Sequence, residues 1–152
     1  MKRIPIAYCL LKGNKQYKDL KGLVLIYDDN LIKITISKFP VNNLKCSQSI
    51  IAIHIHEGKE CNSQNSFESA LGHYNPNKCE HPYHAGDLGN LFVNKDGTVL
   101  MMMKYDRFDI NDIIGRTIIL HSKFDDFKTQ PSGDSGERIA CGIIKRLYKV
   151  TD

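Results

Sequence analysis

With 152 residues, the chain is long enough for one domain with a hydrophobic core, which we expect to span residues 1–152. Hydrophobic residues make up 41% and charged residues 25% of the sequence, and no apolar run approaches the roughly 20 residues of a membrane helix, so no membrane is expected as a partner. The net charge of +4 is dispersed along the chain, which argues against nucleic acid and suits a small anionic substrate.

The first part of the chain predicts three strands, over Ile4–Leu11, Leu23–Tyr27 and Leu31–Ser37. The basic Lys2-Arg3 pair before an apolar run has some character of a signal peptide, but Pro5 interrupts that run and no small-residue cleavage site follows. We therefore expect a first strand and a cytoplasmic protein, with an exported one as the alternative.

The rest of the chain continues the β pattern. A long polar stretch from Glu57 to Asn90 separates a strand over Ile50–His56 from the later ones, and Ile110–Ile114 suits a short helical turn. Seven or eight short strands predict an antiparallel sandwich or barrel. The remaining predicted strands are Thr98–Tyr105, Thr117–His121 and Ile139–Val150.

The histidines are the candidate site. His54 and His56 are two apart on a predicted strand, so both side chains project from one face, although such a pair is more often an ordinary pair of surface residues. His81, His84 and Asp87 follow at intervals of three, a donor set that suits Zn²⁺. The other two histidines that complete a two-metal set are His73, a natural fourth zinc ligand, and His121, at the end of a strand.

The cysteine count is odd. With five cysteines, at least one thiol stays outside any intramolecular disulfide. No Cys-x-x-Cys pair occurs, which argues against a zinc ribbon or a thioredoxin-type centre.

Five segments, in this order, closely resemble the copper–zinc superoxide dismutase family, and the loop around residues 125–133 resembles its bacterial-type branch. The resemblance runs essentially end to end. The segments are His54-Ile55-His56-Glu57-Gly58, Gly72-His73-Tyr74-Asn75-Pro76, His84-Ala85-Gly86-Asp87-Leu88-Gly89-Asn90, Ile114-Gly115-Arg116-Thr117-Ile118-Ile119-Leu120-His121 and Gly136-Glu137-Arg138-Ile139-Ala140-Cys141-Gly142.

The resemblance implies an all-β fold, an eight-stranded Greek-key β-barrel (an immunoglobulin-like sandwich) with long metal-binding and channel loops. It implies that superoxide is converted to oxygen and hydrogen peroxide while copper cycles between two oxidation states and zinc holds the geometry. His73 would bridge the metals and carry a proton. The implied copper ligands are His54, His56, His73 and His121, and the implied zinc ligands are His73, His81, His84 and Asp87.

Other roles follow from the resemblance alone. Asp125 would link the copper ligand His54 to the zinc ligand His81, although it also reads as an ordinary solvated acidic turn. Arg138 would guide the anion to copper, although by itself it could be any surface arginine. The implied disulfide joins Cys61 to Cys141, and the implied free thiols are Cys9, Cys46 and Cys79.

Three departures from the family's pattern bear on the rate and remove no ligand. His81 and His84 are unusually close in sequence, the span from His121 to Arg138 is short, and Glu137 places a carboxylate beside Arg138. The alternative functions are a non-enzymatic copper-binding or copper-buffering domain of the same family and, more remotely, a zinc hydrolase. A homodimer is possible, but the sequence indicates no dimer face.

Overall fold

The computed structural model describes residues 2–148, and they form one antiparallel sheet of eight strands. The all-β, eight-stranded fold expected from the sequence is confirmed. The helical turn expected at 110–114 is present as a single short α-helix, and four 3-10 turns complete the set. The strands are β1 (Pro5–Gly13), β2 (Lys21–Tyr27), β3 (Leu31–Ser37), β4 (Ile50–His56), β5 (Asp87–Phe92), β6 (Val99–Lys104), β7 (Thr117–His121) and β8 (Arg138–Arg146), and the helix is α1 (Ile110–Ile113).

Two sequence predictions of strands need correction. The polar stretch expected from Glu57 to Asn90 ends earlier, because residues from Asp87 onward form β5. This strand has poor β propensity at its acidic, glycine and amide positions, and it forms because it pairs with β4 at the edge of the sheet. The last strand was expected to reach Val150 but ends at Arg146, and residues 149–150 lie outside the described part of the chain.

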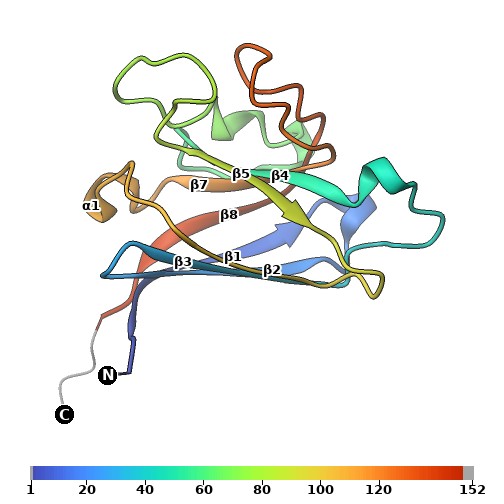
Figure 1. The fold of residues 1–152 in the computed structure, drawn as a ribbon, viewed down its shortest axis with the longest axis horizontal. Coiled ribbons are helices and arrows are strands. Elements are labelled where there is room, and N and C mark those ends of the chain that lie inside the picture. Colours follow the sequence, from blue (N-terminus) through green and yellow to red (C-terminus); the bar gives the residue numbers. More distant parts are fainter. Residues whose placement is uncertain (1, 149–152) are drawn as a thin grey trace.

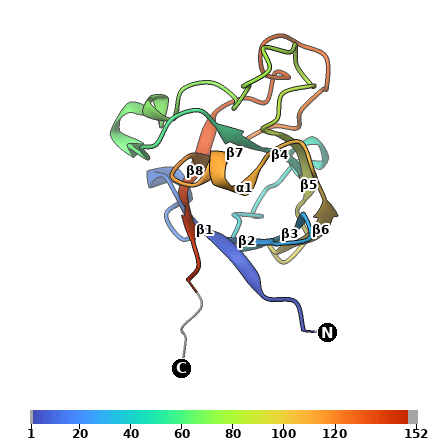
Figure 2. The same cartoon turned by 90° about the vertical axis from the view of Figure 1, so that its left-hand side faces the viewer.

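The strand order is β5-β4-β7-β8-β1-β2-β3-β6, with every pair antiparallel. The connections from β3 to β4 and from β6 to β7 cross over the ends of the barrel, which gives the expected Greek-key pattern. The two edge strands, β5 and β6, approach each other and nearly close the barrel, as the end-on view in Figure 2 shows.

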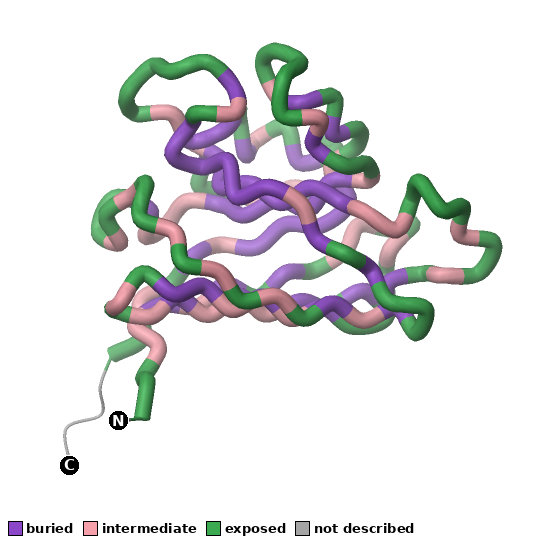
Figure 3. The backbone as a smooth tube through the Cα atoms, viewed as in Figure 1, coloured by how far each residue is buried: buried purple, intermediate pink, exposed green. Residues whose placement is uncertain are grey.

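Alternating side chains fill the barrel interior. On β3, for example, Ile32, Ile34 and Ile36 are buried while Lys33 and Thr35 point outward. Figure 3 shows this alternation of buried and partly exposed residues along the strands. The interior cluster draws on all eight strands, so the barrel is a rigid support for whatever its outer surface carries.

Two long loops cover the outer face of β4 and β7. Residues 57–86 connect β4 to β5, and residues 122–137 connect β7 to β8; both lie above this side of the barrel (Figure 1). Beneath them Ile119 packs against Phe67, Ala70 and Cys141 in a second, smaller apolar cluster. The face of β4 and β7 that would otherwise meet water is therefore an enclosed layer between barrel and loops.

No helix within residues 2–148 is long and apolar enough to cross a membrane.

Candidate metal centre

All six histidines lie in the layer between the barrel and the two long loops. They fall into two groups with one member in common, and within each group the candidate ligand atoms lie within 4.8 Å of one another. Every member is buried. The groups are His54, His56, His73 and His121, and His73, His81, His84 and Asp87, the same sets that the sequence analysis selected.

The first group is built from adjacent strands. His54 and His56 leave β4 on its outer face, opposite Ile53 and Ile55, which enter the core. β4 pairs with β7, so the end of β7 brings His121 to the same face, after an irregularity in the β7–β8 pairing at that residue. An isolated bridge between His56 and His73 fixes the middle of the covering loop on β4.

The second group comes from the loop that precedes β5 and from Asp87, the first residue of that strand. The backbone nitrogen of His84 donates to Oδ2 of Asp87 at 3.0 Å, so the spacing of three is locked into a turn. The carboxylate of Asp87 also faces three ring nitrogens: Nδ1 of His73 at 2.7 Å, of His81 at 3.0 Å and of His84 at 3.3 Å. Four donor groups thus converge around one point.

Asp125 connects the two groups. Its Oδ2 lies 2.7 Å from Nε2 of His54, and its Oδ1 lies 2.7 Å from Nε2 of His81. Gly133 passes directly over this carboxylate, where an added Cβ would lie 2.0 Å from Oδ1, so only glycine fits. The alternative reading of Asp125 as a solvated acidic turn is wrong, because the side chain is fully buried.

These hydrogen bonds decide which ring nitrogens are free to bind metal. Burial opposes ionisation of Asp125, but hydrogen bonds from His54, from the Phe127 backbone N–H and from His81 hold its pKa at about 2, so it is a carboxylate that only accepts. His54 and His81 must then donate through Nε2, which leaves a lone pair on each Nδ1. His56 donates through Nδ1 to the Leu71 carbonyl at 2.8 Å and keeps its lone pair on Nε2.

The freed nitrogens are buried and unpartnered. Among residues 2–148, Nδ1 of His54 and Nε2 of His73 find no hydrogen-bond partner, and Nε2 of His56 lies 3.4 Å from Nε2 of His121. Nδ1 of His81 bears a lone pair yet sits 3.0 Å from a carboxylate oxygen. A buried lone pair that lacks a hydrogen-bond partner or faces an anion is costly unless a cation lies beside it, so the residues present fit metal ions at both positions.

The local electrostatics favour the same state. Burial lowers the pKa of His54 to about 4, despite its hydrogen bond to Asp125. Burial and the neighbouring imidazoles lower the pKa of His56 and His121 well below the ordinary value. At neutral pH these rings are neutral, which is the form that binds a metal.

A cleft of about 460 Å³ gives access to the first group. Arg138 lines it together with parts of both long loops and four of the histidines. The other lining residues are His56, Gly72, His73, Asn75, His84, His121, Pro131, Ser132, Ser135 and Gly136. Arg138 donates to the carbonyl of Phe67 at 2.8 Å and to that of Leu71 at 2.6 Å, so its guanidinium is fixed at the cleft.

Glu137 does not line this cleft. It lines a neighbouring hollow together with Glu68 and Arg138, so the weakening of anion guidance expected from its charge stays a prediction. Burial lowers the pKa of Arg138, and the charge of Glu68 opposes that shift.

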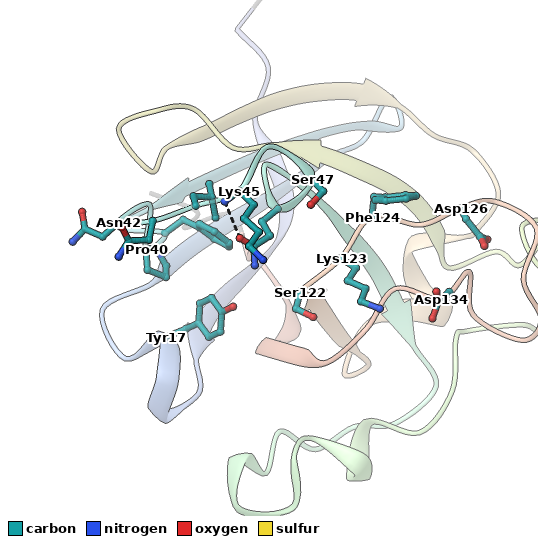
Figure 4. Close-up of a pocket in the computed structure, with 14 residues that line it drawn as sticks. Tyr17, Pro40, Asn42, Lys45, Ser47, Ser122, Lys123, Phe124, Asp126 and Asp134 are labelled. Carbon is teal, nitrogen blue, oxygen red and sulfur yellow. Dashed lines mark hydrogen bonds between the residues drawn. The ribbon is translucent and has the colours of Figure 1, made fainter.

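A larger pocket, of about 720 Å³, lies on the far side of the β7–β8 loop and is shown in Figure 4. Its lining includes Tyr17, Lys45, Lys123 and Asp134. None of the candidate metal ligands lines this pocket, so pocket volume alone does not identify the metal centre.

The disulfide between Cys61 and Cys141 is present, with a Cα–Cα distance of 5.8 Å. It ties the covering loop to β8, one strand away from His121. Cys9 is a buried thiol, and Cys46 and Cys79 are exposed thiols, so the free cysteines are those expected from the sequence.

Sequence reasoning missed two residues that support the second group. The hydroxyl of Tyr105 lies 2.9 Å from the Ala85 carbonyl and 3.1 Å from the Asp87 carbonyl, and Arg107 donates to the Pro82 carbonyl at 2.9 Å. Both follow β6 and are far from the loop in sequence. They bond to backbone atoms, so no pattern of residue types could have indicated them.

Comparisons with known proteins agree on one family. The sequence model described as "Copper/zinc superoxide dismutase (SODC)" matches residues 21–144. The chain is 33% identical over 129 residues to "Superoxide dismutase [Cu-Zn] 2" of Aquifex aeolicus (strain VF5), covering 76% of this chain and 71% of that protein. It is 39% identical over 131 residues to "Superoxide dismutase-like protein YojM" of Bacillus subtilis (strain 168), covering 77% of this chain and 64% of that one.

The fold has a close counterpart among solved structures. The crystal structure of the clock protein EA4 superposes with a TM-score of 0.75 at 23% sequence identity, covering 94% of this chain and 96% of that one. At this identity the likeness concerns the fold.

Proposed function

Because this chain belongs to the copper/zinc superoxide dismutase family, we propose that it is a superoxide dismutase, which converts two superoxide anions and two protons into oxygen and hydrogen peroxide. Copper would be held by the first histidine group and zinc by the second. The observation that carries the proposal is His73, the member common to both groups, whose two ring nitrogens face different groups.

His73 supports a shared ligand in atomic detail. Its Nδ1 faces Asp87 at 2.7 Å and Nδ1 of His84 at 3.4 Å, both members of the zinc group. Its Nε2 is buried among the imidazoles of the copper group, and the described part of the chain offers it no hydrogen-bond partner. Nε2 of His73 is thus the atom at which this chain would hold or release a proton beside the substrate.

When bound, copper would supply the one-electron chemistry and zinc would supply fixed positive charge and geometry. The chain's own residues do the rest. Asp125 sets the tautomers of His54 and His81 through its two 2.7 Å contacts, so each ring presents its other nitrogen. The barrel and the disulfide hold the rings in place, and the covering loops keep bulk water away from them.

Arg138 would attract and orient the substrate. Superoxide is a small anion, and a fixed guanidinium beside the copper group raises the local concentration of anions. The two carbonyl hydrogen bonds keep the guanidinium at the wall of the cleft, where it lines the same space as His56 and His121.

The alternative is a non-enzymatic copper-binding or copper-buffering role. One relative is named only as superoxide dismutase-like, and this name supports the alternative. It would use the same first histidine group but no substrate at Arg138.

One experiment separates the two functions. The metal-free, zinc-only and copper–zinc forms are compared for superoxide removal, with superoxide decay followed directly by its ultraviolet absorbance. We expect activity in the copper–zinc form alone. A protein that binds one copper and one zinc per chain, as measured by elemental analysis, and yet leaves the decay of superoxide unchanged would support copper buffering and reject the dismutase.

A further inference from the structure

The barrel surface opposite the metal centre carries an unusual combination of leucines and lysines. It is the outer face of five adjacent strands, β8-β1-β2-β3-β6, and we call it the outer sheet face. In Figure 1 β1, β2 and β3 lie on the side of the barrel away from the two long loops. Its outward residues include Tyr8, Leu10, Leu23, Leu25, Leu100 and Met102, together with Lys12, Lys21, Lys33, Lys104 and Lys145.

The strand register arranges these residues in rows across the sheet. One row runs from Leu10 to Leu23 and on, past Thr35, to Leu100. The next row runs Lys145, Tyr8, Leu25, Lys33 and Met102. On β3 these rows pass through Thr35 and Lys33, so the apolar side chains form two groups, one on β1 and β2 and one on β6, with lysines between them and at the ends.

Three of these apolar side chains are largely exposed to solvent, while Tyr8, Leu23 and Leu25 are half-buried. Leu10 is 63% exposed, Leu100 is 66% exposed and Met102 is 54% exposed. None of the six apolar residues belongs to the barrel interior or to the layer packed against it. Exposed apolar side chains gathered on one face of a sheet in this way are typical of a contact surface.

The charges on this face have one sign. In residues 2–148, the outward positions of these five strands include no aspartate or glutamate. Lys12 lies directly opposite Lys21 on the paired strands β1 and β2, an arrangement of like charges that is unfavourable by itself. The ion pair of Lys104 is to Asp29, in the β2–β3 turn. Such a face complements a negatively charged partner.

The residue types indicate which negatively charged partner fits. Lysine is depleted in protein–protein interfaces, where arginine and aromatic residues dominate. A second copy of this chain packed face to face would bring lysines against lysines. Nucleic acid would satisfy the lysines but not the leucines. A lipid surface satisfies both, because headgroup phosphates pair with flexible lysines while leucine and methionine enter the apolar layer beneath.

We propose that the outer sheet face docks the protein on the surface of an anionic lipid bilayer, as a peripheral contact without a membrane span. This departs from the expectation of no membrane partner, which rested on the lack of a long apolar segment. Docked in this way, the protein would turn the cleft beside His121 and Arg138 away from the bilayer, since the loops that form it lie on the other side of the barrel (Figure 1). The proposal is independent of metal binding and of the dismutase activity.

The test is co-sedimentation of the full-length, metal-loaded protein with vesicles. Vesicles of pure phosphatidylcholine are compared with vesicles containing phosphatidylserine at about a third of the lipid. We expect binding to the anionic vesicles only, weakened by salt. Each lysine near such a surface contributes roughly a fivefold factor, so Lys12→Gln, Lys33→Gln and Lys145→Gln together should weaken binding on the order of 100-fold.

Two controls make the result specific. Lys59→Gln, Lys78→Gln and Lys95→Gln remove the same charge from exposed loop positions and should leave binding nearly unchanged. Leu10→Ser with Leu100→Ser keeps every charge and should weaken binding even at low salt, with folding verified by circular dichroism and thermal melting.

Three outcomes would overturn the proposal. The first is equal loss in both lysine triples, which would indicate a non-specific charge effect. The second is no binding to anionic vesicles by the wild-type protein at low salt. The third is a wild-type protein that does not bind vesicles but forms a dimer in analytical ultracentrifugation, with Leu10→Ser and Leu100→Ser together dissociating that dimer. This result would make the face an interface between two copies of the chain.

Discussion

Replacing Asp125 by asparagine tests how hydrogen bonds prepare the ring nitrogens for metal. Asp125→Asn preserves shape but turns one of the two carboxylate oxygens into an NH₂ donor. Oδ1 receives two donors, Nε2 of His81 at 2.7 Å and the Phe127 backbone N–H at 2.8 Å, whereas Oδ2 receives only Nε2 of His54. The amide oxygen should therefore stay at the Oδ1 position, and the NH₂ should face His54.

His54 must then accept at Nε2 and carry its proton on Nδ1. That proton occupies the atom that would bind copper, so the penalty falls on the copper group. Losing such an outer hydrogen-bond partner costs 10–100-fold in metal affinity, or roughly 1.4–2.8 kcal/mol. The order of intrinsic affinities alone predicts the opposite, since copper binds imidazole more tightly than zinc and zinc would be lost first.

Two measurements decide between these expectations. Chelator competition gives the dissociation constants of copper and zinc for the wild type and the variant, and we expect copper to lose the larger factor. Nitrogen-15 spectra of the metal-free variant report the tautomers directly, and the ring of His54 should change while that of His81 does not. Asp134→Asn is the matched control, an exposed aspartate of the same loop.

The reasoning is refuted if the tautomer of His54 is unchanged in Asp125→Asn. It is also refuted if zinc weakens while copper is retained at wild-type affinity, because the amide would then have turned the other way.

Four further outcomes are expected. Cys141→Ser opens the loop closed by Cys61, whose ends are 80 residues apart, and should cost about 4 kcal/mol of unfolding free energy in urea, with an exposed free cysteine replaced as control. Arg138→Ala should lower superoxide removal most at low ionic strength, with copper content unchanged; full activity with the original salt dependence would contradict a steering role. Tyr105→Phe removes the hydroxyl that contacts the Ala85 and Asp87 carbonyls and should weaken zinc more than copper in chelator competition; unchanged affinities would make the contact dispensable. Burial lowers the pKa of His54 to about 4, so as the pH falls the unfolded chain binds this proton before the folded protein does. The metal-free protein should therefore lose up to about 3 kcal/mol of unfolding free energy between about pH 6.5 and pH 4. A urea midpoint that does not change over this pH range would be the contrary result.

Local pattern was enough to predict most strands of the barrel. β3, β4 and β7 begin and end at the predicted residues, because a strand with one face in the core must alternate or run apolar whatever its neighbours are. β5 was not predicted from the sequence, and the reason is the opposite one. Its residues have little preference for a strand, and hydrogen bonding to β4 makes it one.

The sequence by itself determined the donors, since the histidines and Asp87 are chemically suited to metal and their motifs follow the order of the family. Only the tertiary structure decided which nitrogen of each ring is available. That choice depends on Asp125 lying between His54 and His81, and on the Leu71 carbonyl lying against His56, contacts that join residues 15 to 71 positions apart. A tautomer is fixed by the partner that the other nitrogen meets, and a sequence lists the partners without saying which of them meet.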